Sequence, residues 1–132
     1  FLIAYAINII IAQRLVRRLC EYCKKPIQKI DPVFPLSLGF SEEEIKKTVF
    51  YDAVGCSKCH NGYKGRAAIH ETLYFSKTIR KLIFETGTDI NEEAIKEEMA
   101  KEGMHNLRAA GRERIKQGLT TLSEVASITT ED

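Results

Sequence analysis

The stretch 55-GCSKCHNGYKGRAAIHE-71 concentrates cysteine, histidine, glycine and basic side chains in one short segment. Its two cysteines, Cys56 and Cys59, form a C-x-x-C pair, and a second such pair lies upstream at Cys20 and Cys23. These are all four cysteines of the chain, so none is left over. Four thiolates complete a closed tetrahedral zinc site, and the two intervening residues let each pair form a tight turn with both sulfurs facing one point. The pattern therefore predicts a structural Zn²⁺ bound by these four cysteines.

Other chemistries use the same residue types. An iron–sulfur cluster also takes four cysteines, although its usual spacings are tighter. A thioredoxin-like redox site needs one C-x-x-C pair, but the first pair is not flanked by a clear β-α-β unit. With four cysteines available, we expect His60 and His70 to be ordinary surface or strand histidines rather than ligands. A catalytic zinc keeps an open coordination position, so a shell of four cysteines predicts an architectural metal.

The metal would close a long loop, because residues 24–55 separate the two pairs. Compact zinc ribbons place roughly 15–20 residues there. All three prolines fall within residues 24–40, which predicts an irregular connection. The segment FSEEEIKK then predicts a short helix in which Ser41 is the N-cap and Glu44 completes a capping box.

The opening FLIAYAINIIIA is very apolar, but it is shorter than the ~20 residues that a membrane-spanning helix needs. We expect a buried segment that was cut from its partners, so the chain is predicted to be a fragment. Residues 1–20 are predicted to be a helix. Isoleucine and leucine recur near helical spacing, and Arg14, Arg17 and Arg18 collect toward the C-terminal end, where cations suit the helix dipole.

The second half of the chain predicts one strand followed by helices. Residues 66–75 are rich in β-branched and aromatic side chains and predict a strand. Ser76 is the expected N-cap of the next helix, and Gly87, Gly103 and Gly118 are the expected stops of successive helices. The predicted helices lie at residues 77–85, 89–103, 106–118 and 121–128. Short connections between such helices favour antiparallel packing into a small bundle.

Composition excludes some functions. The chain has 132 residues, of which 44% are hydrophobic, enough for a real core. Twenty basic residues against 18 acidic ones give a net charge of +2. This near-balance predicts no general attraction to nucleic acid, although basic residues do cluster around the first cysteine pair. Neither a G-x-x-x-x-G-K-[ST] nor a G-x-G-x-x-G phosphate loop is present, so we expect no nucleotide site within this chain.

Three segments together resemble a known family. AQRLVRRLCEYC, then GCSKCHNGYKGRAAIHE, then GMHNLRAAGRERIKQGLTTLSEVASIT are similar, in order, to the C-terminal third of the type II secretion and type IV pilus assembly ATPases. The match includes the four cysteines, the G-Y-x-G-R segment that ends at Arg66, and Glu71. Ala68 and Ala110 depart from residues common in the family. These departures leave open which branch of the family the chain resembles. Retraction-type relatives generally lack the cysteine pairs, so that branch fits least.

The resemblance implies properties beyond this chain. It implies a hexameric cytoplasmic motor at the bacterial inner membrane, which uses ATP and Mg²⁺ to assemble a pilus or pseudopilus. The expected partners are the motor's own ATPase core, neighbouring subunits and an inner-membrane platform protein. The Walker motifs and the catalytic acids of such a motor lie upstream of a segment like this one. We therefore expect this chain alone to be inactive in ATP hydrolysis, with no catalytic residue.

The predicted fold class is α+β and mostly α, as part of a P-loop ATPase C-terminal domain. Residues 1–19 are expected to end the ATPase core, residues 20–65 to form the zinc-binding subdomain, and residues 66–132 to form a strand and a helical bundle. The zinc subdomain is expected to present a surface to partners. The alternative is a free-standing zinc module that binds nucleic acid or protein. A redox enzyme is a third hypothesis.

Overall fold

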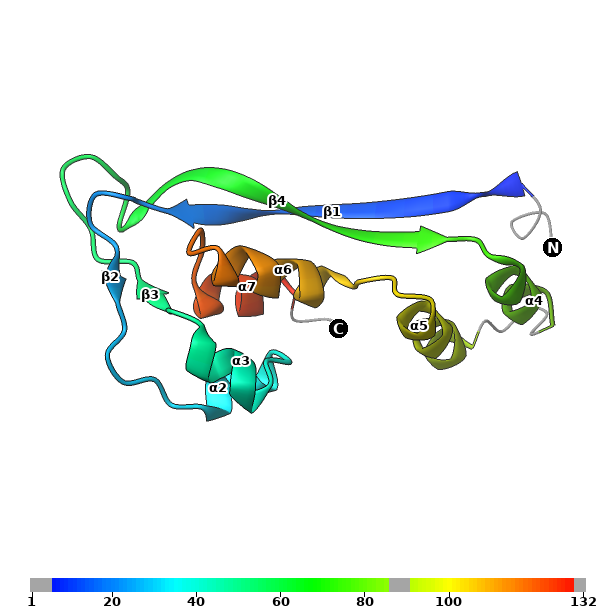
Figure 1. Cartoon of the computed structure of the whole chain (residues 1–132). Coiled ribbons are helices and arrows are strands. Elements are labelled where there is room, and N and C mark those ends of the chain that lie inside the picture. The colour runs from blue at the N-terminus through cyan, green and yellow to red at the C-terminus, as the bar shows by residue number, and fades with distance from the viewer. Residues whose placement is uncertain (1–5, 86–90, 130–132) are drawn as a thin grey trace. The chain divides into compact units, whose positions relative to one another are not determined.

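The computed structural model of the chain (Figure 1) describes residues 6–85 and 91–129. The chain divides into two compact units. The first comprises Phe1–Ala12 and His70–Asn106, and the second comprises Gln13–Ile69 and Leu107–Asp132. All four cysteines belong to the second unit. Among the described residues, no helix has the length and apolar character needed to cross a bilayer.

The helix predicted over residues 1–20 is wrong, because Ile9–Leu19 forms a β-strand, β1. Residues 1–5 lie outside the described part of the chain. The apolar positions that suggested a helix, Ile9, Ile11, Leu15 and Leu19, all carry odd numbers, so they fit the two-residue period of a strand equally well. The run Ile9, Ile10 and Ile11 also favours a strand, because β-branched side chains lose rotamer freedom in a helix. A long pairing partner decides between the two structures.

That partner is β4, Tyr63–Tyr74, which includes most of the strand predicted at residues 66–75. The two strands form a two-stranded sheet and run in opposite directions (Figure 1). At one end of the pair, the Cys20 N–H donates to the carbonyl of Gly62 at 2.9 Å. At the other end, the Phe75 N–H donates to the carbonyl of Asn8 at 2.8 Å. The first cysteine pair therefore begins where β1 ends.

The long connection between the cysteine pairs is more ordered than predicted. Strands β2, Lys25–Pro26, and β3, Tyr51–Asp52, pair antiparallel at its base. A short helix, α2, covers Val33–Ser37 where an irregular segment was expected. Pro32 is its N-cap, with φ of −65°, and Pro35 lies in its first turn, where the missing N–H costs no helical hydrogen bond. Proline therefore starts this helix instead of preventing it.

Helix α3, Glu42–Lys47, confirms the predicted capping box. The Ser41 hydroxyl accepts a hydrogen bond from the Glu44 N–H at 3.2 Å. The Glu44 carboxylate in turn accepts one from the Ser41 N–H at 2.9 Å. Two backbone donors that the helix start would leave without partners are thereby satisfied.

The four C-terminal helices form where the sequence predicts them, two in each unit. Helices α4, Lys77–Glu85, and α5, Glu92–Lys101, belong to the first unit and contact each other. Helices α6, Leu107–Lys116, and α7, Leu122–Ile128, form the other pair. The Ser76 hydroxyl accepts a hydrogen bond from the Ile79 N–H, as expected of a cap. Gly87, the expected stop of the first of these helices, lies outside the described residues.

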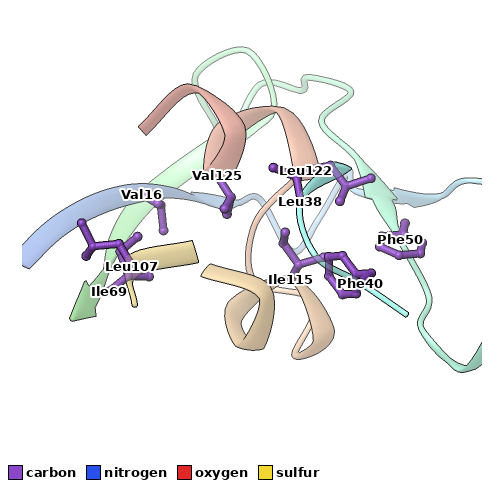
Figure 2. Close-up of a cluster of buried hydrophobic side chains, with 9 residues drawn as sticks. All are labelled: Val16, Leu38, Phe40, Phe50, Ile69, Leu107, Ile115, Leu122 and Val125. Carbon is purple, nitrogen blue, oxygen red and sulfur yellow. The ribbon is translucent and has the colours of Figure 1, made fainter. Parts of the chain in front are cut away.

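The second unit has a hydrophobic core, to which the sheet, the long connection and the last two helices contribute (Figure 2). Phe40 and Phe50 from the connection meet edge to face, with ring centroids 5.5 Å apart. Gly111 lets α6 approach α7 closely, since a Cβ there would lie 2.5 Å from a methyl group of Val125. The buried cluster consists of Val16, Leu38, Phe40, Phe50, Ile69, Leu107, Ile115, Leu122 and Val125.

Candidate metal centre

Two tight turns hold the four cysteines. The first turn follows β1 directly, and the Lys24 N–H donates to the carbonyl of Cys20 at 3.1 Å. The second turn follows β3, and the Cys59 N–H donates to the carbonyl of Cys56 at 3.4 Å. Both turns lie at the same end of the long strand pair (Figure 1). The pairing of β1 with β4 and of β2 with β3 therefore brings together two cysteine pairs that the sequence separates.

The four thiol sulfurs lie within 4.8 Å of one another. The Sγ atoms of Cys20 and Cys56 are 3.8 Å apart, and those of Cys23 and Cys59 are 3.7 Å apart. The Sγ atoms of Cys56 and Cys59 are also 3.7 Å apart. In a tetrahedron with metal–sulfur bonds of about 2.3 Å, neighbouring sulfurs lie about 3.8 Å apart. The donor set and its spacing therefore fit a tetrahedral thiolate metal site.

Backbone N–H groups point at two of these sulfurs. The Gly55 N–H donates to Cys23 Sγ at 3.3 Å, and the Cys56 N–H donates to Cys59 Sγ at 3.2 Å. Such donors stabilise negative charge on sulfur and orient the ligands of a metal. The backbone of the second turn therefore supports one of its own thiolates, Cys59, and one thiolate of the first turn, Cys23.

The thiols differ in how readily they ionise. Partial burial is the main reason that the pKa of the Cys23 thiol rises to about 11, against the opposing N–H of Gly55. Burial acts in the same direction on Cys59, but the N–H groups of Cys56 and Gly62 outweigh it and lower the pKa of this thiol to about 7. Cys20 is buried and Cys56 is exposed, so the cluster opens to solvent on the side of the second pair.

Histidine does not join the cluster. Within the described residues, the four cysteines form the one group of at least three His, Cys, Asp or Glu side chains close enough to hold a metal ion. His60 is exposed just after the second turn, where its N–H and carbonyl exchange hydrogen bonds with those of Tyr63. His70 is exposed on β4. Arg66 is also exposed on β4.

The sequence analysis missed a network that ties the end of β1 to helix α7. The Arg17 guanidinium donates two hydrogen bonds to one oxygen of Glu124, at 2.9 and 3.1 Å, and stacks 4.2 Å from the Tyr63 ring centroid. The Arg17 N–H donates to the other oxygen of Glu124 at 2.9 Å. The dipole role that the sequence suggested for Arg17 is therefore wrong, because the residue lies in a strand and pairs with a buried carboxylate.

The segment G-L-T-T-L-S-E, residues 118–124, supplies most of the partners in this network. The Thr120 hydroxyl donates to the carbonyl of Arg17 at 2.8 Å. The Thr121 hydroxyl lies 2.9 Å from the Tyr63 hydroxyl and caps α7 by accepting from the Glu124 N–H. The Lys24 ammonium donates to the carbonyl of Gly118 at 2.9 Å. These residues belong to a segment that supported the family resemblance, but the sequence did not indicate what their side chains contact.

Comparison with known proteins identifies a family and several relatives of this chain. The family described as "Type II/IV secretion system protein" matches residues 1–127. A type IV pilus assembly ATPase, PilB, of Thermus thermophilus is 44% identical over 132 residues, which are 99% of this chain and 14% of that protein. PilB of Acinetobacter baylyi is 40% identical over 133 residues, which are 99% of this chain and 22% of that protein.

The type II secretion system ATPase E of Vibrio cholerae is 35% identical over 132 residues, which are 99% of this chain and 25% of that protein. The four thiols of this chain lie close enough together to hold one metal ion. The chain belongs to the type II/IV secretion system protein family. It spans a quarter or less of the length of these three relatives.

Proposed function

We propose that this chain is the zinc-bearing C-terminal region of an ATPase that assembles a pilus or secretes protein, and that its own role is structural. The family match and the names of the relatives support the motor assignment. The thiol cluster supports the structural role, and it is the single observation that carries the proposal. No residue of this chain is assigned to ATP hydrolysis, which would belong to the remainder of such a motor together with ATP and Mg²⁺.

Cys20, Cys23, Cys56 and Cys59 would hold Zn²⁺ as four thiolates. A closed shell of four sulfurs leaves the ion no open position for a substrate, so the ion would supply folding free energy and no catalysis. It would tie the end of β1 to the turn after β3. Residues 20–65 would then act as one stiff subdomain, and residues 1–19 would continue into the ATPase core. The parent motor would be a hexamer on the cytoplasmic side of the inner membrane. Within it, this region would contact neighbouring subunits and a platform protein.

Metal content is the first measurement. We expect about one zinc per chain by elemental mass spectrometry of protein purified without added metal. Cys56→Ser should lose the zinc and lower the melting temperature by many degrees, because structural zinc supplies folding free energy. Ser57→Ala is the matched control, because it changes a neighbouring side chain and leaves all four sulfurs in place. A Cys56→Ser protein that melts like the parent would exclude a structural zinc.

The motor assignment needs a separate test. The coding sequence that flanks this chain should contain a G-x-x-x-x-G-K-[ST] loop upstream of Phe1 in the same reading frame. The isolated chain should show no ATP hydrolysis above a buffer control. An open reading frame without such a loop would favour the free-standing zinc module and would leave the metal proposal intact.

A further inference from the structure

An exposed tyrosine lies in one of the two turns that form the candidate metal centre. Tyr22 occupies the turn between Cys20 and Cys23, and 67% of its surface is exposed. Lys58, from the turn between the other two cysteines, places its ammonium 4.3 Å from the centroid of the Tyr22 ring. The Lys64 ammonium approaches the same ring to 5.8 Å. One ring therefore gathers two cations at the surface, in the arrangement of a cation–π contact.

A shallow hollow adjoins this ring. It encloses about 310 Å³ and is lined by Arg18, Leu19, Glu21, Tyr22 and Lys64. We call Arg18, Tyr22, Lys58 and Lys64 the knuckle patch. Lys64 belongs to both the hollow and the pair of cations on the ring, so the patch is continuous.

The cations of the knuckle patch form no ion pair with a carboxylate that the structure describes. Within residues 6–85 and 91–129, no acidic side chain forms an ion pair with Arg18, Lys58 or Lys64. Elsewhere in the same unit, Arg17 pairs with Glu124, and Lys116 pairs with Glu44 and Glu113. The knuckle patch therefore presents three cations around an exposed aromatic ring, and no carboxylate in the described part of the chain forms an ion pair with them.

We propose that the knuckle patch binds a carboxylate-rich segment of a partner protein. Separate ammonium groups and a guanidinium around an apolar ring suit several spaced carboxylates. The hollow admits a protruding side chain, which a flat bilayer surface does not offer. A single aromatic ring provides no series of stacking platforms for single-stranded nucleic acid. The Glu21 carboxylate at the hollow also disfavours a dense polyanion such as a phosphate backbone.

The metal would prepare this surface for binding, a step that rests on the function proposed above. Tyr22 and Lys58 each lie between two candidate ligands, so a bound zinc would fix both turns before a partner arrives. A surface ordered in advance loses less conformational entropy on binding. The proposed zinc would therefore strengthen partner binding without contacting the partner.

The test uses a fluorescein-labelled peptide of ten glutamates, with binding to the whole chain measured by fluorescence anisotropy. We expect saturable binding that weakens as salt rises, because exposed charges are screened. Lys58→Glu/Lys64→Glu should weaken binding by at least about tenfold, because it replaces two attractive charges by repulsive ones. Lys46→Glu/Lys77→Glu makes the same change of net charge at two exposed lysines outside the patch and should bind within about twofold of the parent.

Three further measurements test which class of partner the knuckle patch binds and whether the metal contributes to that binding. Vesicles of phosphatidylglycerol and a 20-nucleotide single-stranded DNA are compared with the peptide on the same variants. Tighter binding of either through Lys58 and Lys64 would overturn the proposal in favour of a membrane or nucleic acid. Equal loss in both double variants would also overturn it, since net charge alone would then explain the binding. Cys56→Ser should weaken peptide binding several-fold while it loses zinc.

Zinc is measured on every sample, which separates the two proposals. A parent protein that contains zinc but does not bind the peptide would refute the knuckle patch and leave the structural zinc standing. A parent protein without zinc that still binds through Lys58 and Lys64 would refute the zinc and leave the surface standing.

Discussion

Gly62 shows how one residue without a side chain shapes the candidate metal centre. Its φ is +95°, and its carbonyl accepts the hydrogen bond from the first cysteine of the site. A Cβ at Gly62 would lie 2.6 Å from the Cβ of Ala53 and 2.7 Å from its carbonyl carbon. The backbone of Ala53 cannot move aside as the end of a long side chain can. Glycine is therefore required here both for its conformation and for its small volume.

Gly62→Ala should be strongly destabilising, and Gly65→Ala provides the comparison. Gly65 also has a positive φ, of +81°, but a Cβ there would meet only Arg18, at 4.0 Å. Gly65→Ala should cost about 1–2 kcal/mol through backbone conformation alone. Gly62→Ala should cost roughly 1–3 kcal/mol more, because it also overpacks the turn. Urea unfolding at pH 7 measures both, and equal losses would show that the contact with Ala53 is relieved easily.

At the scale of elements, one ion pair joins the long connection to the C-terminal helices. Glu44 of α3 pairs with Lys116 of α6, and Lys116 also reaches Glu113. The hydrogen bond from Lys116 is the largest cause that lowers the pKa of Glu44 from 4.5 to about 2, and the Ser41 N–H adds to it. The same pairing raises the pKa of Lys116. The carboxylate therefore stabilises the fold whenever it is ionised.

Glu44→Gln should remove this contribution and keep the helix start, since glutamine also serves in a capping box. The folded-state pKa of Glu44 lies below its unfolded value, so its stabilisation is fully present above pH 4.5 and is lost as pH falls toward 2. Near neutral pH the variant should be less stable by about 1 kcal/mol, a modest value because both side chains are about one third exposed.

Denaturant unfolding of parent and Glu44→Gln, repeated between pH 7 and pH 2, tests this linkage. The difference in unfolding free energy between the two proteins should shrink as pH falls from 4.5 toward 2. Glu43→Gln, in the same turn of α3, is the control and should follow the parent at every pH. A difference between parent and Glu44→Gln that stays constant down to pH 2 would contradict the assignment to the Glu44 charge.

At the scale of the whole molecule, the two units have separate sources of stability. All four cysteines lie in the second unit, which also contains the large buried cluster. The first unit has its own buried residues, Phe75 and Ile79, and a hydrogen bond of 2.8 Å from the Ser76 hydroxyl to Glu102. Removal of a metal from the cysteine cluster should therefore affect the two units unequally.

Amide hydrogen exchange with and without a zinc chelator measures this inequality. We expect faster deuterium uptake at residues 20–26 and 50–63, because these turns lose the ion that ties them together. Uptake in α4 and α5 should stay unchanged. A matching increase in those two helices would show that both units open together as one cooperative structure.

Much of the local structure was predictable, because its signals lie within a few residues of where they act. The Ser41 and Glu44 pair specifies the start of α3, and Gly118 ends α6 just as a helix-stopping glycine should. The spacing within each cysteine pair likewise indicated a turn with two facing sulfurs. The prediction failed at Ile9–Leu19, where helical and strand periods fit the same apolar residues.

The sequence by itself determined which residues could hold a metal and where most helices begin and end, because those properties depend on residue type and short spacing. Only the tertiary structure decided that the opening segment is a strand, that Arg17 pairs with Glu124, and that Tyr22 gathers two lysines. Each of these depends on a partner that is distant along the chain. Local propensity carries no information about which distant residue a side chain will contact. Tertiary packing determines that contact.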